Sequence, residues 1–136
     1  MILPVLKRVA ADSNVLLSAV IGKAAARVFT RTDLEVITTA FNCDEVREYL
    51  PVLSKKYKLD PQDVSLQFEM LPLSVYPPAY YKEWMPHALR TIKDPDDAHL
   101  LALSMKQGVP IWSNDEDFNL RMVQRYTTAE LLRYFK

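Results

Sequence analysis

The stretch KDPDDAHLLALSMKQGVPIWSNDEDF, residues 93–118, places a cluster of carboxylates on each side of a predicted helix and strand. Residues 95–107 carry apolar side chains at helical spacing, and Gly108 follows them as a helix C-cap. The short apolar run VPIWS, 109–113, favours a strand. A helix that leads into a short apolar strand is typical of a parallel sheet covered by helices.

The rest of the chain repeats this alternation of short apolar strands and helices. Further strands are predicted at VAAD (9–12), LEVITT (34–39), LSVYP (73–77) and 122–126. Helices are predicted at 14–20, 23–31, 42–57 with a kink or break at Pro51, 61–70, 80–89 with an interruption near Pro86, and after Thr127 or Thr128. The pattern predicts an α/β fold: one domain, 1–136, with a central, mostly parallel sheet of four to five short strands.

Composition narrows the class of protein further. Seventeen basic residues balance seventeen acidic ones, so no strong overall charge draws the chain to nucleic acid or membranes. The single Cys43 excludes an intramolecular disulfide and is expected to be a buried or inert thiol. The N-terminus has the wrong charge order for a signal peptide, and no stretch approaches the roughly 18–20 apolar residues of a membrane span. A cytoplasmic protein without membrane association is expected.

Four segments far apart in sequence place acids where predicted strands end or helices begin. Asp12 ends the first strand, Glu45 lies near the start of the helix after the second, Asp97 begins the helix before the fourth, and Asp115 follows that strand. In open α/β sheets, ligands bind beyond the carboxyl ends of the strands. Two carboxylates about 4 Å apart repel by about 4 kcal/mol at a dielectric near 20, so a cluster favours a cation. Oxygen donors without His or Cys suit Mg²⁺ or Mn²⁺.

Most of these acids also have a simpler interpretation as helix caps. Asp94 before Pro95 is best explained as an N-cap, and Asp96 as a solvated charge in the first turn. Asp97 fits a capping acid as well as a metal ligand. Asp115 would cap the short turn after it.

Two further cap assignments concern the first and second acidic segments. Asn42 is a possible cap ahead of Glu45. Asp12 is hardest to explain in this way, because no helix is expected to start nearer than Asn14. The residues alone leave caps and a metal site equally open.

Four motifs in order resemble the acidic motifs of the PIN-domain nucleases. They are ADSNVLLSA (11–19), CDEVREYL (43–50), KDPDDAHLLALS (93–104) and IWSNDEDF (111–118). The similarity covers nearly the whole chain, whose size suits a free-standing, VapC-like toxin. It implies a PIN-like (Rossmann-like) three-layer α/β/α fold.

The resemblance assigns roles residue by residue. It makes Asp12, Glu45, Asp97 and Asp115 the catalytic acids and metal ligands, and Asp117 an additional acid that also contacts the metal. Glu48 is a weaker alternative to Glu45. Asn14 and Ser113 are implied as supporting polar neighbours, with Asn14 orienting the loop and Ser113 hydrogen-bonding within the site. Asn114 replaces a common glycine, and asparagine tolerates left-handed backbone angles.

The implied activity is a metal-dependent ribonuclease that hydrolyses RNA with Mg²⁺ or Mn²⁺. The implied partners are RNA, an antitoxin whose tail would block the acidic groove, and a second copy in a homodimer. Arg90 and Lys93 are candidates for RNA contact because they lead into the third acidic motif. His87 and His99 receive no catalytic role.

Two other functions remain as alternatives. One is a catalytically silent PIN-fold module with a binding or regulatory role. The other is a receiver-like domain in which an aspartate accepts a phosphoryl group. The latter usually needs paired acids on the first strand and a lysine after a later one, which this sequence lacks.

Overall fold

The computed structural model describes residues 5–31 and 33–135. Its centre is a five-stranded parallel sheet with the strand order β3-β2-β1-β4-β5. The strands are Arg8–Ala11 (β1), Glu35–Thr39 (β2), Leu73–Tyr76 (β3), Ile111–Trp112 (β4) and Arg125–Tyr126 (β5). Every neighbouring pair is parallel, so all carboxyl ends meet at one edge.

Strand β1 is the centre of the sheet and the place where the strand order reverses. Ala10 pairs with Ile37 of β2 on one side and with Ile111 of β4 on the other. Val9, Ala10 and Ala11 are all fully buried, which explains why this strand is apolar on both faces. Asp12 follows it directly and therefore lies at the topological switch point.

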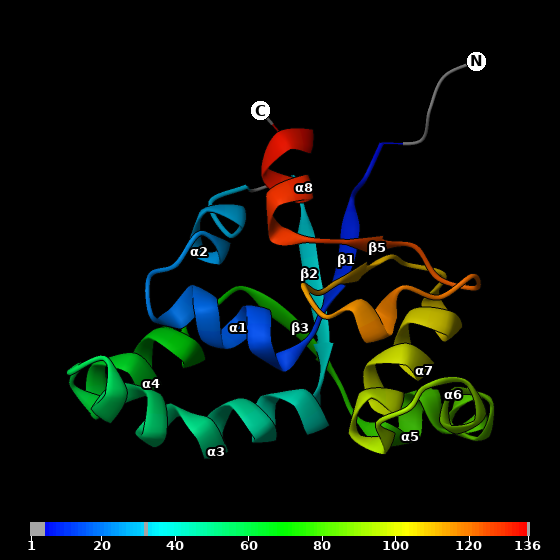
Figure 1. Cartoon of the computed structure of the whole chain (residues 1–136), viewed down its shortest axis with the longest axis horizontal. Coiled ribbons are helices and arrows are strands. Elements are labelled where there is room, and N and C mark those ends of the chain that lie inside the picture. The colour runs from blue at the N-terminus through cyan, green and yellow to red at the C-terminus, as the bar shows by residue number, and fades with distance from the viewer. Residues whose placement is uncertain (1–4, 32, 136) are drawn as a thin grey trace.

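Helices cover both faces of the sheet (Figure 1). They are Ser13–Val20 (α1), Ala25–Val28 (α2), Ala40–Lys56 (α3), Pro61–Glu69 (α4), Pro78–Tyr81 (α5), Met85–Thr91 (α6), Ala98–Gln107 (α7) and Thr128–Tyr134 (α8), with 3₁₀ turns at Lys82–Trp84 (η1), Pro95–Asp97 (η2) and Glu116–Phe118 (η3). One core packs α1 to α4 and α8 against the sheet, and the other packs α5 to α7. The predicted three-layer α/β/α architecture is confirmed.

Two proline-based expectations have different outcomes. The sequence predicts a kink or break at Pro51, and the break is absent because α3 runs from Ala40 to Lys56 through this residue. Pro51 is exposed and lacks the amide hydrogen for one backbone hydrogen bond of the helix. Near Pro86 the interruption is real: η1 precedes α6, and the proline lies in the first turn of α6, where its missing amide costs nothing.

Other elements largely match, although the last two strands are shorter than expected. Gly108 ends α7 in the left-handed conformation, and Thr127 caps α8 with a complete capping box. Cys43 is buried in α3, and burial raises the pKa of its thiol to about 11, as expected of an inert core residue. Within the described residues, no helix has the length and apolar character that crossing a membrane requires.

Candidate active site

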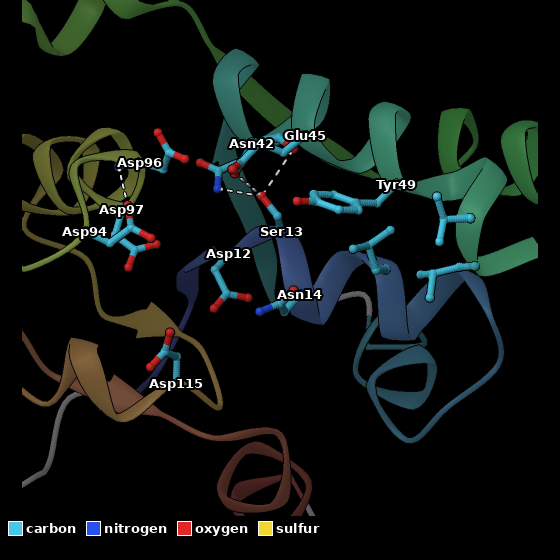
Figure 2. Close-up of a pocket in the computed structure, with 13 residues that line it drawn as sticks. Asp12, Ser13, Asn14, Asn42, Glu45, Tyr49, Asp94, Asp96, Asp97 and Asp115 are labelled. Carbon is cyan, nitrogen blue, oxygen red and sulfur yellow. Dashed lines mark hydrogen bonds between the residues drawn. The ribbon is translucent and has the colours of Figure 1, made fainter. Parts of the chain in front are cut away.

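A cavity of about 400 Å³ lies at the carboxyl edge of the sheet, between α1, α3 and the turns before and after the α7–β4 unit (Figure 2). Acids from all four predicted motifs line it: Asp12, Glu45, Asp94, Asp96, Asp97 and Asp115. None of the described residues that line it is basic. The parallel sheet therefore brings the four segments together as the sequence predicted.

Asp12 holds the first and fourth motifs together. One carboxylate oxygen accepts a hydrogen bond from the Val15 amide at 2.9 Å, and the other accepts one from the Ser113 hydroxyl. The Ser113 Oγ in turn accepts from the Asp115 amide at 2.9 Å. Asp12 is only 6 % exposed, so this network fixes a buried carboxylate at the wall of the cavity.

The expectation that no helix starts nearer to Asp12 than Asn14 is wrong by one residue. Helix α1 begins at Ser13, and Asp12 is its N-cap. The cap bond uses one oxygen and leaves further lone pairs on the carboxylate. Capping and a role in the site are therefore compatible at this residue.

The acids of the third and fourth motifs differ in whether they act as helix caps or are free to bind a metal. Asp94 caps η2 by accepting from the Asp96 amide at 3.0 Å, and Asp115 caps η3 by accepting from the Asp117 amide at 2.9 Å. Asp97 makes no side-chain cap bond to α7. The cap interpretation is therefore right for Asp94, holds alongside a place in the cavity for Asp115, and fails for Asp97.

Glu45 is held by a chain of hydrogen bonds that the sequence analysis missed. The Ser13 hydroxyl donates to Glu45 Oε1 at 2.7 Å, and Asn42 Nδ2 donates to Ser13 Oγ at 2.9 Å. The Thr39 hydroxyl donates to Asn42 Oδ1 at 2.6 Å. This chain joins the end of β2 to α1 and α3.

The proposed cap role of Asn42 is wrong. Helix α3 starts two residues earlier, at Ala40, and Thr39 caps it by accepting from the Asn42 amide at 2.9 Å. Asn42 is instead a buried link to Ser13. The only sequence signals for this role are that Ser13 follows Asp12 and that Asn42 lies three residues before Glu45.

Among the described residues, the tightest group of potential metal ligands is Asp97, Asp115 and Asp117. One carboxylate oxygen from each lies within 4.8 Å of the other two. Oxygens on opposite sides of an ion bound at about 2.1 Å are about 4.2 Å apart, so small side-chain shifts would enclose Mg²⁺. Asp12 and Glu45 line the same cavity but are not in this group.

The electrostatics of the cavity disfavour several negative charges without a cation. Burial raises the pKa of Asp12, and burial followed by the nearby Asp96 and Asp94 raises the pKa of Glu45. The pKa of Asp97 rises to about 7, first because of burial and then because of the surrounding carboxylates. A hard divalent cation with oxygen ligands fits this donor set.

The other predicted residues are placed as follows. Asn14 is exposed and lines the cavity. Arg90, on α6, and Lys93, just before Asp94, are exposed but do not line it. Glu48 is exposed and also lies outside the lining.

His99 and Asn114, which lie within the acidic motifs, make packing and hydrogen-bond contacts outside the cavity. His99 stacks on Phe41 with ring centroids 4.0 Å apart. Asn114 does not adopt left-handed angles, since Lys58 is the one non-glycine residue with positive φ in the described chain. Its side-chain oxygen instead accepts from the Thr128 amide at 2.9 Å and fastens the turn to α8.

The family described as PIN domain matches residues 10–136. No curated protein matches the chain.

Solved structures with a similar fold include toxin–antitoxin assemblies. VapBC2 from Rickettsia felis, solved with a DNA fragment from its promoter, has 11 % identity and a TM-score of 0.62 over 88 % of this chain and 98 % of that chain. A toxin–antitoxin complex from Klebsiella pneumoniae has 15 % identity and a TM-score of 0.66 over 88 % and 97 %. VapC20 from Mycobacterium tuberculosis, a toxin that cleaves the sarcin–ricin loop, has 18 % identity and a TM-score of 0.55 over 82 % and 92 %.

Identities this low show a shared fold and leave activity and partners open. The family match runs from within β1 to the last residue and contains all four acidic motifs. The chain belongs to the PIN domain family.

Proposed function

We propose that this protein is a metal-dependent endoribonuclease that hydrolyses RNA phosphodiesters, with Asp12, Glu45, Asp97 and Asp115 as its catalytic acids. The observation that carries this proposal is the cavity at the switch point, where acids from four separate segments meet without a basic residue among the described lining. Because the chain belongs to the PIN domain family, we do not retain the hypothesis of a receiver-like phosphoacceptor domain.

The donor set favours Mg²⁺ or Mn²⁺ as cofactor. Asp97 and Asp115 are the central ligands in this proposal, with Asp117 beside them and Asp12 on the adjoining wall. When bound, such an ion would supply Lewis-acid stabilisation of the phosphodiester and a water molecule of lowered pKa.

The chain's own residues would set the geometry for this chemistry. Ser113 holds Asp12 and the backbone of Asp115 in one position, and Ser13 holds Glu45 toward the cavity. Asp97 has a pKa of about 7 in the metal-free protein, so its carboxyl is partly protonated near neutral pH. Cation binding should therefore release a proton from this site.

The toxin part of a toxin–antitoxin pair is the biological role that we propose. It is supported by the similarity to VapBC2 and to the Klebsiella complex. The proposed partners are RNA, an antitoxin that would cover the cavity, and a second copy of the chain. Arg90 and Lys93 remain the proposed contacts for the RNA backbone, because both are exposed on the approach to the third motif.

A cleavage assay with purified protein tests the activity. RNA should be cut in the presence of Mn²⁺ or Mg²⁺, the cut should be blocked by EDTA, and Asp97→Asn should abolish it. The matched control is Glu116→Gln, because Glu116 is an exposed acid of the fourth motif that does not line the cavity. Cleavage that survives EDTA or Asp97→Asn would overturn the proposal. Metal binding without cleavage of any RNA would favour the catalytically silent module.

A further inference from the structure

We propose that the active-site cavity contains a separate binding site for one unstacked RNA base, formed by Leu17, Tyr49, Val52 and Leu53. These four apolar or aromatic residues, here called the apolar ledge, line the same cavity as the acids. The base next to the scissile phosphate would stack on Tyr49. This inference rests on the proposed ribonuclease function and assigns to Tyr49 the contact with one base of the substrate.

Helix α3 places the apolar ledge beside the acids. Tyr49 lies four residues after Glu45, and Leu53 lies four residues after Tyr49, so all three share one face of the helix. At a rise of 1.5 Å per residue, each interval of four is about 6 Å along the axis. Figure 2 shows the Tyr49 ring beyond Ser13 and Glu45, with its hydroxyl end directed toward the acids.

Two residues of the apolar ledge are more exposed than core packing explains, whereas Leu17 and Leu53 pack in or against the core. Tyr49 is 53 % exposed and Val52 is 62 % exposed, and both line the same cavity as the acids. Sites for organic ligands combine apolar walls with a few convergent polar groups and have volumes of about 300–1,000 Å³. The cavity of about 400 Å³ is of this size, which is more than a single ion requires.

The chemistry of the cavity favours a base over a protein side chain as the occupant. The acidic end would hold a phosphate only through a cation, whereas the apolar ledge has no charged residue and suits a neutral ring face. A base can lie flat on Tyr49 only after it leaves a helical stack, which single-stranded RNA permits most readily.

The experiment combines abasic substrates with substitutions of Tyr49. Oligoribonucleotides with one abasic position on either side of the cleavage site are compared with the intact oligonucleotide in the presence of Mn²⁺. In the unmodified protein, one of the two abasic positions should lower kcat/KM by about 5- to 100-fold, as expected for loss of one stacked base. In Tyr49→Ala this penalty should fall to less than about twofold, and in Tyr49→Phe it should persist.

Two controls separate this inference from failure of the proposed function. Tyr57→Ala changes another exposed tyrosine, 40 % exposed at the end of α3 and outside the cavity, and should keep the full abasic penalty. Mn²⁺ binding, followed by electron paramagnetic resonance, should be the same in Tyr49→Ala as in the unmodified protein. Metal-dependent cleavage with an abasic penalty that is absent or unchanged by Tyr49→Ala would overturn the base site alone and leave the apolar ledge as a protein-docking surface. Absence of cleavage in every variant would overturn the ribonuclease function as well.

Discussion

The two acidic turns, Asp94–Asp97 and Asp115–Phe118, have the same local structure but place their acids differently. In each turn the first aspartate accepts a hydrogen bond from the amide two residues later and opens a 3₁₀ turn. In the first turn the cap is Asp94, and the acid of the tight cluster is Asp97. In the second turn the cap, Asp115, belongs to that cluster itself.

The difference comes from what precedes each turn. The second turn lies just after β4, and Ser113, the first residue after that strand, ties the Asp115 amide to Asp12, the first residue after the neighbouring β1. The first turn follows α6 and precedes α7, and all three of its aspartates line the cavity, but Asp97 is the one that belongs to the tight cluster. A cap bond alone therefore does not decide whether an aspartate belongs to the site.

The largest expected effect is on RNA cleavage, which should depend on Asp97 and much less on Asp94. Asp97→Asn and Asp115→Asn should each lower metal-dependent RNA cleavage by more than about 100-fold, because loss of a supporting residue alone typically costs 10- to 100-fold. Asp94→Asn should lower it by less than about tenfold. Initial rates at saturating Mn²⁺ provide the measurement. Equal losses for Asp94 and Asp97 would show that the two positions do not differ in function.

Metal binding should stabilise the protein through the cluster and not through the caps. At an Mn²⁺ concentration about 100 times the dissociation constant, the free energy of unfolding should rise by about 2.7 kcal/mol. The rise should be lost in Asp115→Asn and retained in Asp94→Asn. Chemical denaturation with and without Mn²⁺ measures it, and an unchanged rise in Asp115→Asn would exclude this residue as a ligand.

Ser113→Ala tests the link that distinguishes the second turn. It removes the hydroxyl that donates to buried Asp12 and accepts from the Asp115 amide, so the free energy of unfolding should fall by about 1–3 kcal/mol. Ser113→Thr keeps the hydroxyl and serves as the matched comparison. Urea denaturation is the measurement, and a change below about 0.5 kcal/mol in Ser113→Ala would show that the link contributes little.

The pH dependence of stability should identify Asp97. Its folded pKa of about 7 is above the ordinary value of 3.8, so the folded state binds more protons than the unfolded state between these values. The free energy of unfolding of the metal-free protein should therefore fall as pH rises from about 4 to 7. Asp97→Asn should reduce this slope, to which Asp12 and Glu45 also contribute, and raise stability at pH 8 by about 1–2 kcal/mol, after allowance for solvent screening. Equal slopes in the two proteins would contradict this assignment.

The smallest effect concerns the cap at Asp94. Asp94→Ala should lower the free energy of unfolding by about 1 kcal/mol, the usual cost of losing an N-cap. The change should be independent of Mn²⁺, because Asp94 is outside the tight cluster. A thermal or urea melt with and without the metal checks both points.

The sequence predicted the fold better than the details of the site. Runs such as 9–11 and 34–39 identified the strands because, apart from exposed Glu35, each is buried on both faces. The predicted starts of α1 and α3, Asn14 and Asn42, are one and two residues too late, since the helices begin at Ser13 and Ala40. The roles of Ser13 and Asn42 depend on contacts 29 and 32 residues apart, which local patterns do not contain.

By itself, the sequence determined the alternation of strands and helices, the four acidic motifs and the caps at Asp94 and Asp115, because each depends on neighbouring residues and on solvent. Only the tertiary structure decided that Asp117 joins Asp97 in the tightest cluster, that Asp97 has a pKa of about 7, and that Tyr49 lies beside the acids. The physical reason is that burial and repulsion between carboxylates depend on distances across the sheet edge. Those distances exist only once the parallel strands have brought separate segments together.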